Sequence, residues 1–182
     1  MTSKKTQVLV LAPTRVANTT WPEEAAKWAH TAHLTVVPVT GDMQGRVVAV
    51  RQRADVHAIN YENLPWLVEY WGDRWPYRTV IADESTKLKS FRLRQGGKRA
   101  QALARVAHTK VKRFIELTGT PSPNGLQDLY GQVWFIDRGQ RLGRTYEGFK
   151  QRWFRPHPSG FGLEALPHTQ NEIQKLLSDI CI

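Results

Sequence analysis

Short apolar runs alternate with segments of helical periodicity along the first three-quarters of the chain. Five of these runs have the length of buried strands and end in polar or Gly/Pro-containing turns: residues 7–11, 34–39, 56–59, 79–82 and 113–117. Helices are expected between and after them, one capped by Thr20 with Trp21, Ala25 and Trp28 on one face, others over residues 44–53, 64–71 and 125–136. Repeated strand–helix–strand units favour an α/β fold, with a parallel sheet flanked by helices.

The alternation stops after Gly139. The remainder is basic and is expected to be helical, with a Pro/Gly-rich connector over residues 156–162 and a last helix over residues 171–182. We therefore divide the chain into a sheet-containing part, residues 1–139, and a helical, basic extension of the same lobe, residues 140–182. The first strand begins at residue 7 and the last helix has no terminal cap, so we expect the chain to be a piece of a longer protein.

Positive charge is concentrated in two segments. The chain has 26 Lys and Arg against 16 Asp and Glu, a formal net charge of +10. Residues 85–115, expected to begin as a long helical stretch, contain ten Lys and Arg and no acid, and residues 138–155 mix basic residues with four aromatic ones. Such an excess indicates an acidic partner, most often nucleic acid, or simply a soluble basic surface. The rings fall at helical spacing, which favours core packing over phosphate contact.

Several other functions are excluded. Cys181 is the only cysteine, so no internal disulfide can form, and the six histidines show no metal-ligand spacing. The apolar run near the N-terminus is too short for a signal peptide or a membrane span. We expect a protein of the cytoplasm, with no membrane partner.

An acidic pair, Asp83-Glu84, follows the apolar run 79–82 directly. The carboxyl ends of strands are where open α/β sheets bind ligands. Hydrolysis of a nucleoside triphosphate needs one carboxylate to hold Mg²⁺ and a second group to orient the attacking water, and adjacent residues leaving a strand can divide these roles. The alternative is a helix N-terminus whose acids complement the helix dipole.

Two further strand ends carry polar groups. Thr118-Gly119-Thr120 follows the fifth run, and its hydroxyls can sense a phosphate, although the segment alone is a Pro/Gly turn with Thr caps. Thr14 and Arg15 follow the first run, where they can contact a DNA phosphate or simply remain solvated.

The order of these segments resembles motifs Ia, Ib, II and III of superfamily-two helicases. The matching segments are Leu-Ala-Pro at 11–13, Ile-Asn-Tyr-Glu at 59–62, Asp-Glu-Ser-Thr at 83–86 and Leu-Thr-Gly-Thr-Pro at 117–121. The phrases at 17–22, 83–90 and 118–129 resemble the Swi/Snf-type branch, and in particular its small phage-encoded members. The resemblance covers nearly the whole chain and implies a RecA-like lobe that moves on duplex DNA. If a phage encodes the chain, the cytoplasm in which we expect it is that of the bacterial host.

The resemblance implies a role for each matching residue. Asp83 would hold the Mg²⁺ of Mg-ATP through water, and Glu84 would act as the catalytic base. Thr118, Gly119 and Thr120 would couple the nucleotide state to DNA contact. DNA would be tracked, through its phosphate backbone and without sequence specificity, by six residues: Thr14, Arg15, Asn60, Tyr61, Lys87 and Lys89. The complete enzyme would use ATP and Mg²⁺ and act on double-stranded DNA.

One motif of the family does not occur in this sequence. No P-loop precedes the first strand, and Gly96-Gly97-Lys98-Arg99 is no substitute, because it follows the Asp-Glu strand and has no Ser or Thr after the Lys. The second lobe, with its arginine fingers, does not occur either. We expect an incomplete P-loop NTPase lobe that binds neither ATP nor Mg²⁺ tightly on its own, and that depends on a chain supplying the P-loop and second lobe.

An incomplete lobe also has an alternative function. It would be a non-catalytic DNA-binding or protein-interaction module derived from such a lobe.

The missing P-loop strand also affects the sheet. In RecA-like lobes the P-loop strand lies beside the strand that leads to motif III. Without that neighbour, residues 114–117 are expected to form an unpaired, apolar sheet edge that favours self-association or pairing with another chain.

Overall fold

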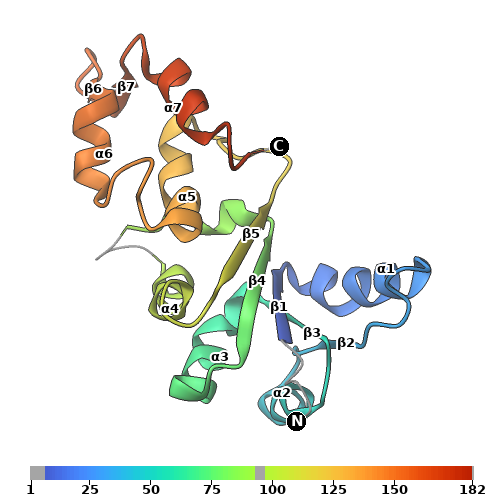
Figure 1. Ribbon diagram of the computed structural model, residues 1–182. Coiled ribbons are helices and arrows are strands. Elements are labelled where there is room, and N and C mark those ends of the chain that lie inside the picture. Colours follow the sequence, from blue (N-terminus) through green and yellow to red (C-terminus); the bar gives the residue numbers. More distant parts are fainter. Residues whose placement is uncertain (1–6, 93–96, 182) are drawn as a thin grey trace.

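A five-stranded parallel sheet forms the centre of the protein (Figure 1). The computed structural model describes residues 7–92 and 97–181. The spatial order is β2-β3-β1-β4-β5, with strands β1 (Gln7–Ala12), β2 (Val36–Pro38), β3 (Val56–Asn60), β4 (Tyr77–Asp83) and β5 (Arg113–Leu117). All four pairings are parallel. This sheet confirms the expected α/β class and all five expected strands.

Both faces of the sheet are covered, which explains why its strands read as continuous apolar runs. Successive residues of a strand point to opposite faces, so β1 contributes to two cores. Leu9 and Leu11 belong to the larger core, and Val10 and Ala12 belong to the smaller one, which also contains Ala17. In Figure 1 the helices α3 (Leu64–Trp71) and α4 (Lys98–Ala107) lie on the opposite side of the sheet from α1 (Trp21–Lys27). Helix α2 (Met43–Arg51) contributes to the larger core.

The C-terminal part packs on the lobe through helix α5 (Leu129–Asp137). It consists of α6 (Tyr146–Trp153), the strands β6 (Phe154–Pro156) and β7 (Leu163–Ala165), and α7 (Thr169–Leu177). Phe149 and Trp153 are fully buried and belong to the same core as Tyr130, whose ring centre lies 5.3 Å from that of Phe149. The expected core packing of the basic segment's aromatic residues is confirmed.

Four details of the sequence interpretation were wrong. Thr20 is not a helix cap, because a helical turn, η1 (Val16–Thr20), already precedes it and its backbone is helical. Trp28 lies just beyond the end of α1, where the backbone is extended, so it does not share a helix face with Trp21 and Ala25. The segment after Glu84 is a short 3-10 helix, η4 (Ser85–Leu88), rather than the start of a long helix. The part after Gly139 is not all helical, because the connector that follows Pro156 is the turn of an antiparallel hairpin, β6-β7.

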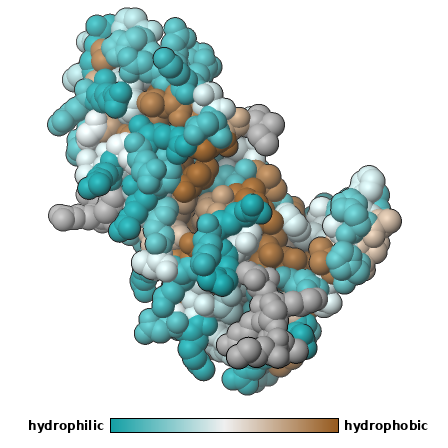
Figure 2. Space-filling view, in the orientation of Figure 1, coloured by the Kyte–Doolittle hydropathy of each residue, from teal (hydrophilic) through white to brown (hydrophobic). Residues whose placement is uncertain are grey.

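Strand β5 lies at an outer edge of the sheet formed by the described residues. Its one pairing is with β4, and Leu117 at its end is 43% exposed. Figure 2 shows apolar surface gathered over the region of β5 and β4. This is the edge that the sequence interpretation assigned to residues 114–117, and self-association or strand pairing there stays a prediction. Among the described residues, no helix is long and apolar enough to cross a membrane.

Candidate active site

The turn after β4 has an unusual backbone. Asp83 is the last residue of the strand, and Glu84 adopts the left-handed conformation, with φ 63° and ψ 56°. That conformation costs a residue with a Cβ roughly 1–2 kcal/mol, so the surroundings must hold it in place. The buried Tyr61 hydroxyl donates a hydrogen bond of 2.9 Å to the Asp83 carbonyl, and the Lys87 amide donates one of 3.1 Å to the Glu84 carbonyl. The chain therefore leaves the strand sharply, and the two acids are held at a fixed bend.

Each of the two carboxylates has one engaged oxygen. The Trp21 indole Nε1 donates to Asp83 Oδ2 at 2.9 Å, and the Thr86 hydroxyl donates to Glu84 Oε1. Within residues 7–92 and 97–181, the structure shows no hydrogen bond to Asp83 Oδ1 or Glu84 Oε2. Both side chains are half-buried. The arrangement thus orients each carboxylate and leaves one oxygen of each available to water.

This donor set fits Mg²⁺ only as a partial site. No group of three or more His, Cys, Asp or Glu side chains in the described part of the chain could hold a metal ion. Mg²⁺ keeps several waters and is typically bound by one or two carboxylates together with substrate phosphates. Asp83 fits such a role through water, and the other ligands would have to come from a nucleotide and a P-loop.

The Thr118-Gly119-Thr120 loop lies beside the acidic turn. Register pairs Asp83 with Leu117, so Thr118 begins next to Glu84 at the same edge of the sheet. The backbone amide of Thr120 donates to the Thr118 hydroxyl at 3.2 Å, which keeps the two threonines together. The structure therefore brings together the two segments that the sequence interpretation linked to ATP chemistry.

A buried amide, missed at the sequence level, connects these two segments. Gln132 on α5 is 3% exposed. Its Oε1 accepts from the Ser85 hydroxyl at 2.8 Å, and its Nε2 donates to the Pro121 carbonyl at 2.6 Å. The sequence offered one signal of this role, a polar side chain among the apolar residues of the helix. Gln132 ties the residue after Glu84 to the loop after Thr120, which is a physical route for coupling them.

The residues expected to contact DNA fall into two groups. Thr14, Arg15 and Lys87 are exposed, and Thr14 and Arg15 follow β1, the neighbour of β4, at the carboxyl edge of the sheet. Lys89 is half-buried and forms an ion pair of 3.4 Å with Asp128. Asn60 and Tyr61 are 7% and 1% exposed. Their side chains have almost no surface to offer DNA, and Tyr61 supports the acidic turn.

Glu116 on β5 is a third acid near this site that the sequence interpretation missed. Register places it beside Ala82, one residue before Asp83. Its Oε1 is buried and has no hydrogen-bond partner among the described residues. Burial raises the pKa of Glu116 from 4.5 to about 8, against the opposing effect of a hydrogen bond with Ser85. Burial, with further contributions from the charges of Glu116, Asp83 and Glu84, also raises the pKa of the Tyr61 phenol.

The fold and the site together define a class of protein. A parallel sheet in which an Asp-Glu pair ends one strand and a Thr-Gly-Thr loop ends its neighbour is the arrangement of a RecA-like nucleotide-hydrolase lobe. The family model of the SNF2-related domain matches residues 1–182, and the chain belongs to that family. The Swi/Snf-type resemblance is confirmed.

Relatives and solved structures agree with this assignment. Protein p41 of Acyrthosiphon pisum secondary endosymbiont phage 1 is 51% identical over 99% of this chain and 40% of its own length. The mouse DNA excision repair protein ERCC-6-like is 31% identical over 82% of this chain and 12% of its own length. The Sulfolobus solfataricus SWI2/SNF2 ATPase core, solved in complex with dsDNA, is 25% identical with a TM-score of 0.73, over 98% of this chain and 33% of that one. The chain therefore spans less than half the length of each of these proteins.

Proposed function

We propose that this chain is a partial ATPase lobe of a Swi/Snf-type ATP-dependent DNA translocase or helicase. The observation that carries the proposal is the acidic turn beside the Thr118-Gly119-Thr120 loop, where Asp83 and Glu84 each keep one carboxylate oxygen that no described residue engages. Membership of the SNF2-related domain family supports it. The P-loop and the second lobe would come from elsewhere in a longer protein or from another chain.

The two acids would have separate roles. Asp83 would hold a water ligand of Mg²⁺ through its free oxygen, with Trp21 fixing the carboxylate from the other side. Mg²⁺, when bound with ATP, would neutralise charge that develops on the phosphates. Glu84 would accept a proton from the attacking water at its free oxygen. The link through Gln132 would transmit changes at this turn to the loop of Thr118 and Thr120.

The first test is ATP hydrolysis by the isolated 182-residue chain. We expect phosphate release with Mg-ATP and duplex DNA to be no greater than that of the Glu84→Gln variant. The reason is that an arginine finger alone contributes roughly 10³–10⁵ to the rate, and the P-loop supplies most phosphate contacts. Turnover that persists through purification and disappears in Glu84→Gln would contradict the expected inactivity and would show a complete site.

Coding sequence beside the gene separates the catalytic proposal from its alternative. A P-loop encoded upstream, in frame or as a separate chain, would support the ATPase lobe. A lobe expressed without any P-loop partner would instead be the non-catalytic DNA-binding or protein-interaction module.

The second test is DNA binding. The Sulfolobus relative was solved with dsDNA. In this chain the exposed Thr14, Arg15 and Lys87 lie at or near the carboxyl edge of the sheet. If about three phosphates are contacted, affinity for duplex DNA should fall by roughly 40-fold between about 50 and about 200 mM salt, whatever the sequence. Arg15→Gln and Lys87→Gln should each reduce the salt slope by about 1.

Lys175→Gln is the matched control, because Lys175 is exposed on α7, outside this edge, and its replacement removes the same charge. Fluorescence anisotropy with a labelled duplex measures the DNA affinity of the wild type and of the three variants. Affinity that does not change with salt, or an equal loss in Lys175→Gln, would show that the carboxyl edge does not bind the phosphates.

A further inference from the structure

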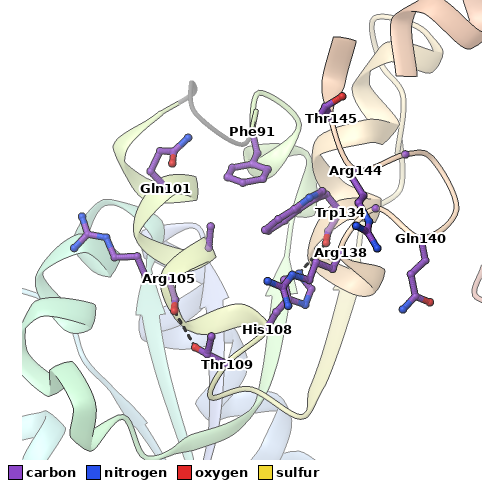
Figure 3. Close-up of a pocket in the computed structure, with 13 residues that line it drawn as sticks. Phe91, Gln101, Arg105, His108, Thr109, Trp134, Arg138, Gln140, Arg144 and Thr145 are labelled. Atoms are coloured by element: carbon purple, nitrogen blue, oxygen red, sulfur yellow. Dashed lines mark hydrogen bonds between the residues drawn. The ribbon is translucent and has the colours of Figure 1, made fainter. Parts of the chain in front are cut away.

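A pocket lies away from the acidic turn. It is a pocket of ≈ 1240 Å³ between α4, α5 and the turn over residues 138–145 (Figure 3). Its wall includes His108 and Thr109, just after α4 and before β5 begins, whereas Asp83 and Thr118 stand at the carboxyl ends of their strands. None of the residues of the candidate active site lines it.

The pocket is strongly basic. Arg105, Arg138 and Arg144 line it, and no described Asp or Glu does. All three arginines are exposed, and within residues 7–92 and 97–181 the structure shows no ion pair to any of them. In Figure 3 Arg138 and Arg144 gather beside His108 and Trp134, while Arg105 turns to the other side.

The one acid in this part of the chain does not neutralise the pocket. Asp137 is 8% exposed, and its carboxylate accepts from the backbone amides of Gly139, Gln140 and Arg141 at 2.8–3.2 Å. It also forms an ion pair of 3.2 Å with Arg141, which points to Asp179 as well. The acid holds the turn together and pairs with Arg141, so that among the described residues it forms no ion pair with the arginines of the pocket.

The turn holds Arg138 in a conformation that glycine adopts at lower cost. Arg138 has φ 58°, at the C-cap of α5, where a left-handed glycine is the usual residue. Gly139 follows with φ 79°, and a Cβ there would lie 2.4 Å from the Gly143 carbonyl oxygen, so the turn has one tight arrangement. A purely structural cap would favour glycine at 138, and the arginine adds a cation to the pocket at some cost in strain.

Aromatic groups complete the wall. The Trp134 ring lies between Phe91 and His108, with ring centres at 4.5 Å and 4.8 Å. Its Nε1 is buried without a hydrogen-bond acceptor among the described residues. His108 Nε2 donates to the Trp134 carbonyl at 2.9 Å. Burial lowers the pKa of His108, and the charge of Arg138 lowers it further, against the opposing effects of the Trp134 carbonyl and Asp137.

We propose that this pocket binds a phosphate group, with Arg138 and Arg144 as its charged donors and His108 beside them. Guanidinium groups match phosphate oxygens in geometry and charge, and the aromatic wall suits the organic part of a phosphate ester. The phosphate belongs either to a free phosphate ester or to a DNA strand. The proposal does not depend on ATP hydrolysis, and Glu84→Gln leaves the pocket intact.

The test uses pyrophosphate as the probe and the His108 ring signals in NMR as a local readout. We expect a saturable shift of these signals and a rise in the apparent pKa of His108, because a bound anion favours the imidazolium. Arg138→Gln and Arg144→Gln should each weaken binding about tenfold. The matched control is Arg53→Gln, since Arg53 is exposed after α2, outside the pocket, and carries the same charge.

A further variant separates binding from folding. Arg138→Gly should lose affinity as Arg138→Gln does, while its Tm stays the same or rises, because glycine relieves the left-handed strain. Repeating the titration with duplex DNA identifies the source of the phosphate. A shift of the His108 signals with DNA assigns the site to the phosphates of a DNA strand. A shift with pyrophosphate alone assigns it to a small phosphate ester. The proposal is overturned if neither probe moves the His108 signals, or if Arg53→Gln weakens binding as much.

Discussion

Replacing Gly131 with alanine is expected to lower the free energy of unfolding by about 2 kcal/mol, although the glycine lies inside helix α5. Helix propensity alone predicts the opposite sign, a gain of roughly 0.8–1 kcal/mol. Contact decides the outcome, because a Cβ at this position would lie 2.6 Å from the Leu88 carbonyl oxygen and 2.7 Å from that of Lys89. Both are backbone atoms, which cannot turn aside as a flexible side chain can.

The same contact joins stability to the candidate site. Leu88 ends η4, the short helix that follows Glu84, so α5 must move away from η4 or push it toward the acidic turn. Urea unfolding of the variant measures the effect. The control is Gly97→Ala, because a Cβ on Gly97, just before α4, meets nothing within 4 Å. A more stable Gly131→Ala protein would show that helix propensity outweighs this contact.

The fold was predictable where one local rule acted alone. The strand Arg113–Leu117 and the helix Leu64–Trp71 have the expected bounds, because each is an apolar segment bounded by polar or Gly/Pro-containing sequence. The β6-β7 hairpin was missed because its strands have three residues each, too few for a period of two to stand out from a Pro/Gly-rich connector. The last helix ends at Leu177 rather than at the chain end, although its apolar positions Ile173 and Leu177 are buried as expected.

Site prediction succeeded for segments and was weaker for individual side chains. Motif order placed the acidic turn and the Thr118 loop at one edge of the sheet, because parallel strands bring their carboxyl ends together. It could not reveal that Tyr61 is buried under the turn or that Gln132 bridges two segments, since both depend on contacts between residues far apart in the chain. The roles given to Asp83, Glu84 and the threonines stay predictions.

Glu116→Gln is expected to remove a pH dependence from the stability of the protein. In the folded chain the pKa of Glu116 is about 8, against 4.5 for an ordinary glutamate. Between these values the folded state binds the proton more tightly than the unfolded state does. The carboxyl group's contribution to stability is therefore complete below about pH 4.5 and is lost as pH rises through about 8. The slope attributable to this group is at most roughly 1.4 kcal/mol for each pH unit.

Urea unfolding of the wild type and of Glu116→Gln between pH 5 and pH 9 measures how stability changes with pH in each protein. Subtracting one slope from the other removes the contributions of all other titrating groups. Glu116→Gln should be the more stable of the pair at the alkaline end, because a carboxylate whose Oε1 is buried, with no hydrogen-bond partner among the described residues, no longer forms. Glu69→Gln is the control, since Glu69 is exposed on α3 and should leave the slope unchanged. Equal slopes in wild type and Glu116→Gln would show that Glu116 is ionised in the folded protein at neutral pH.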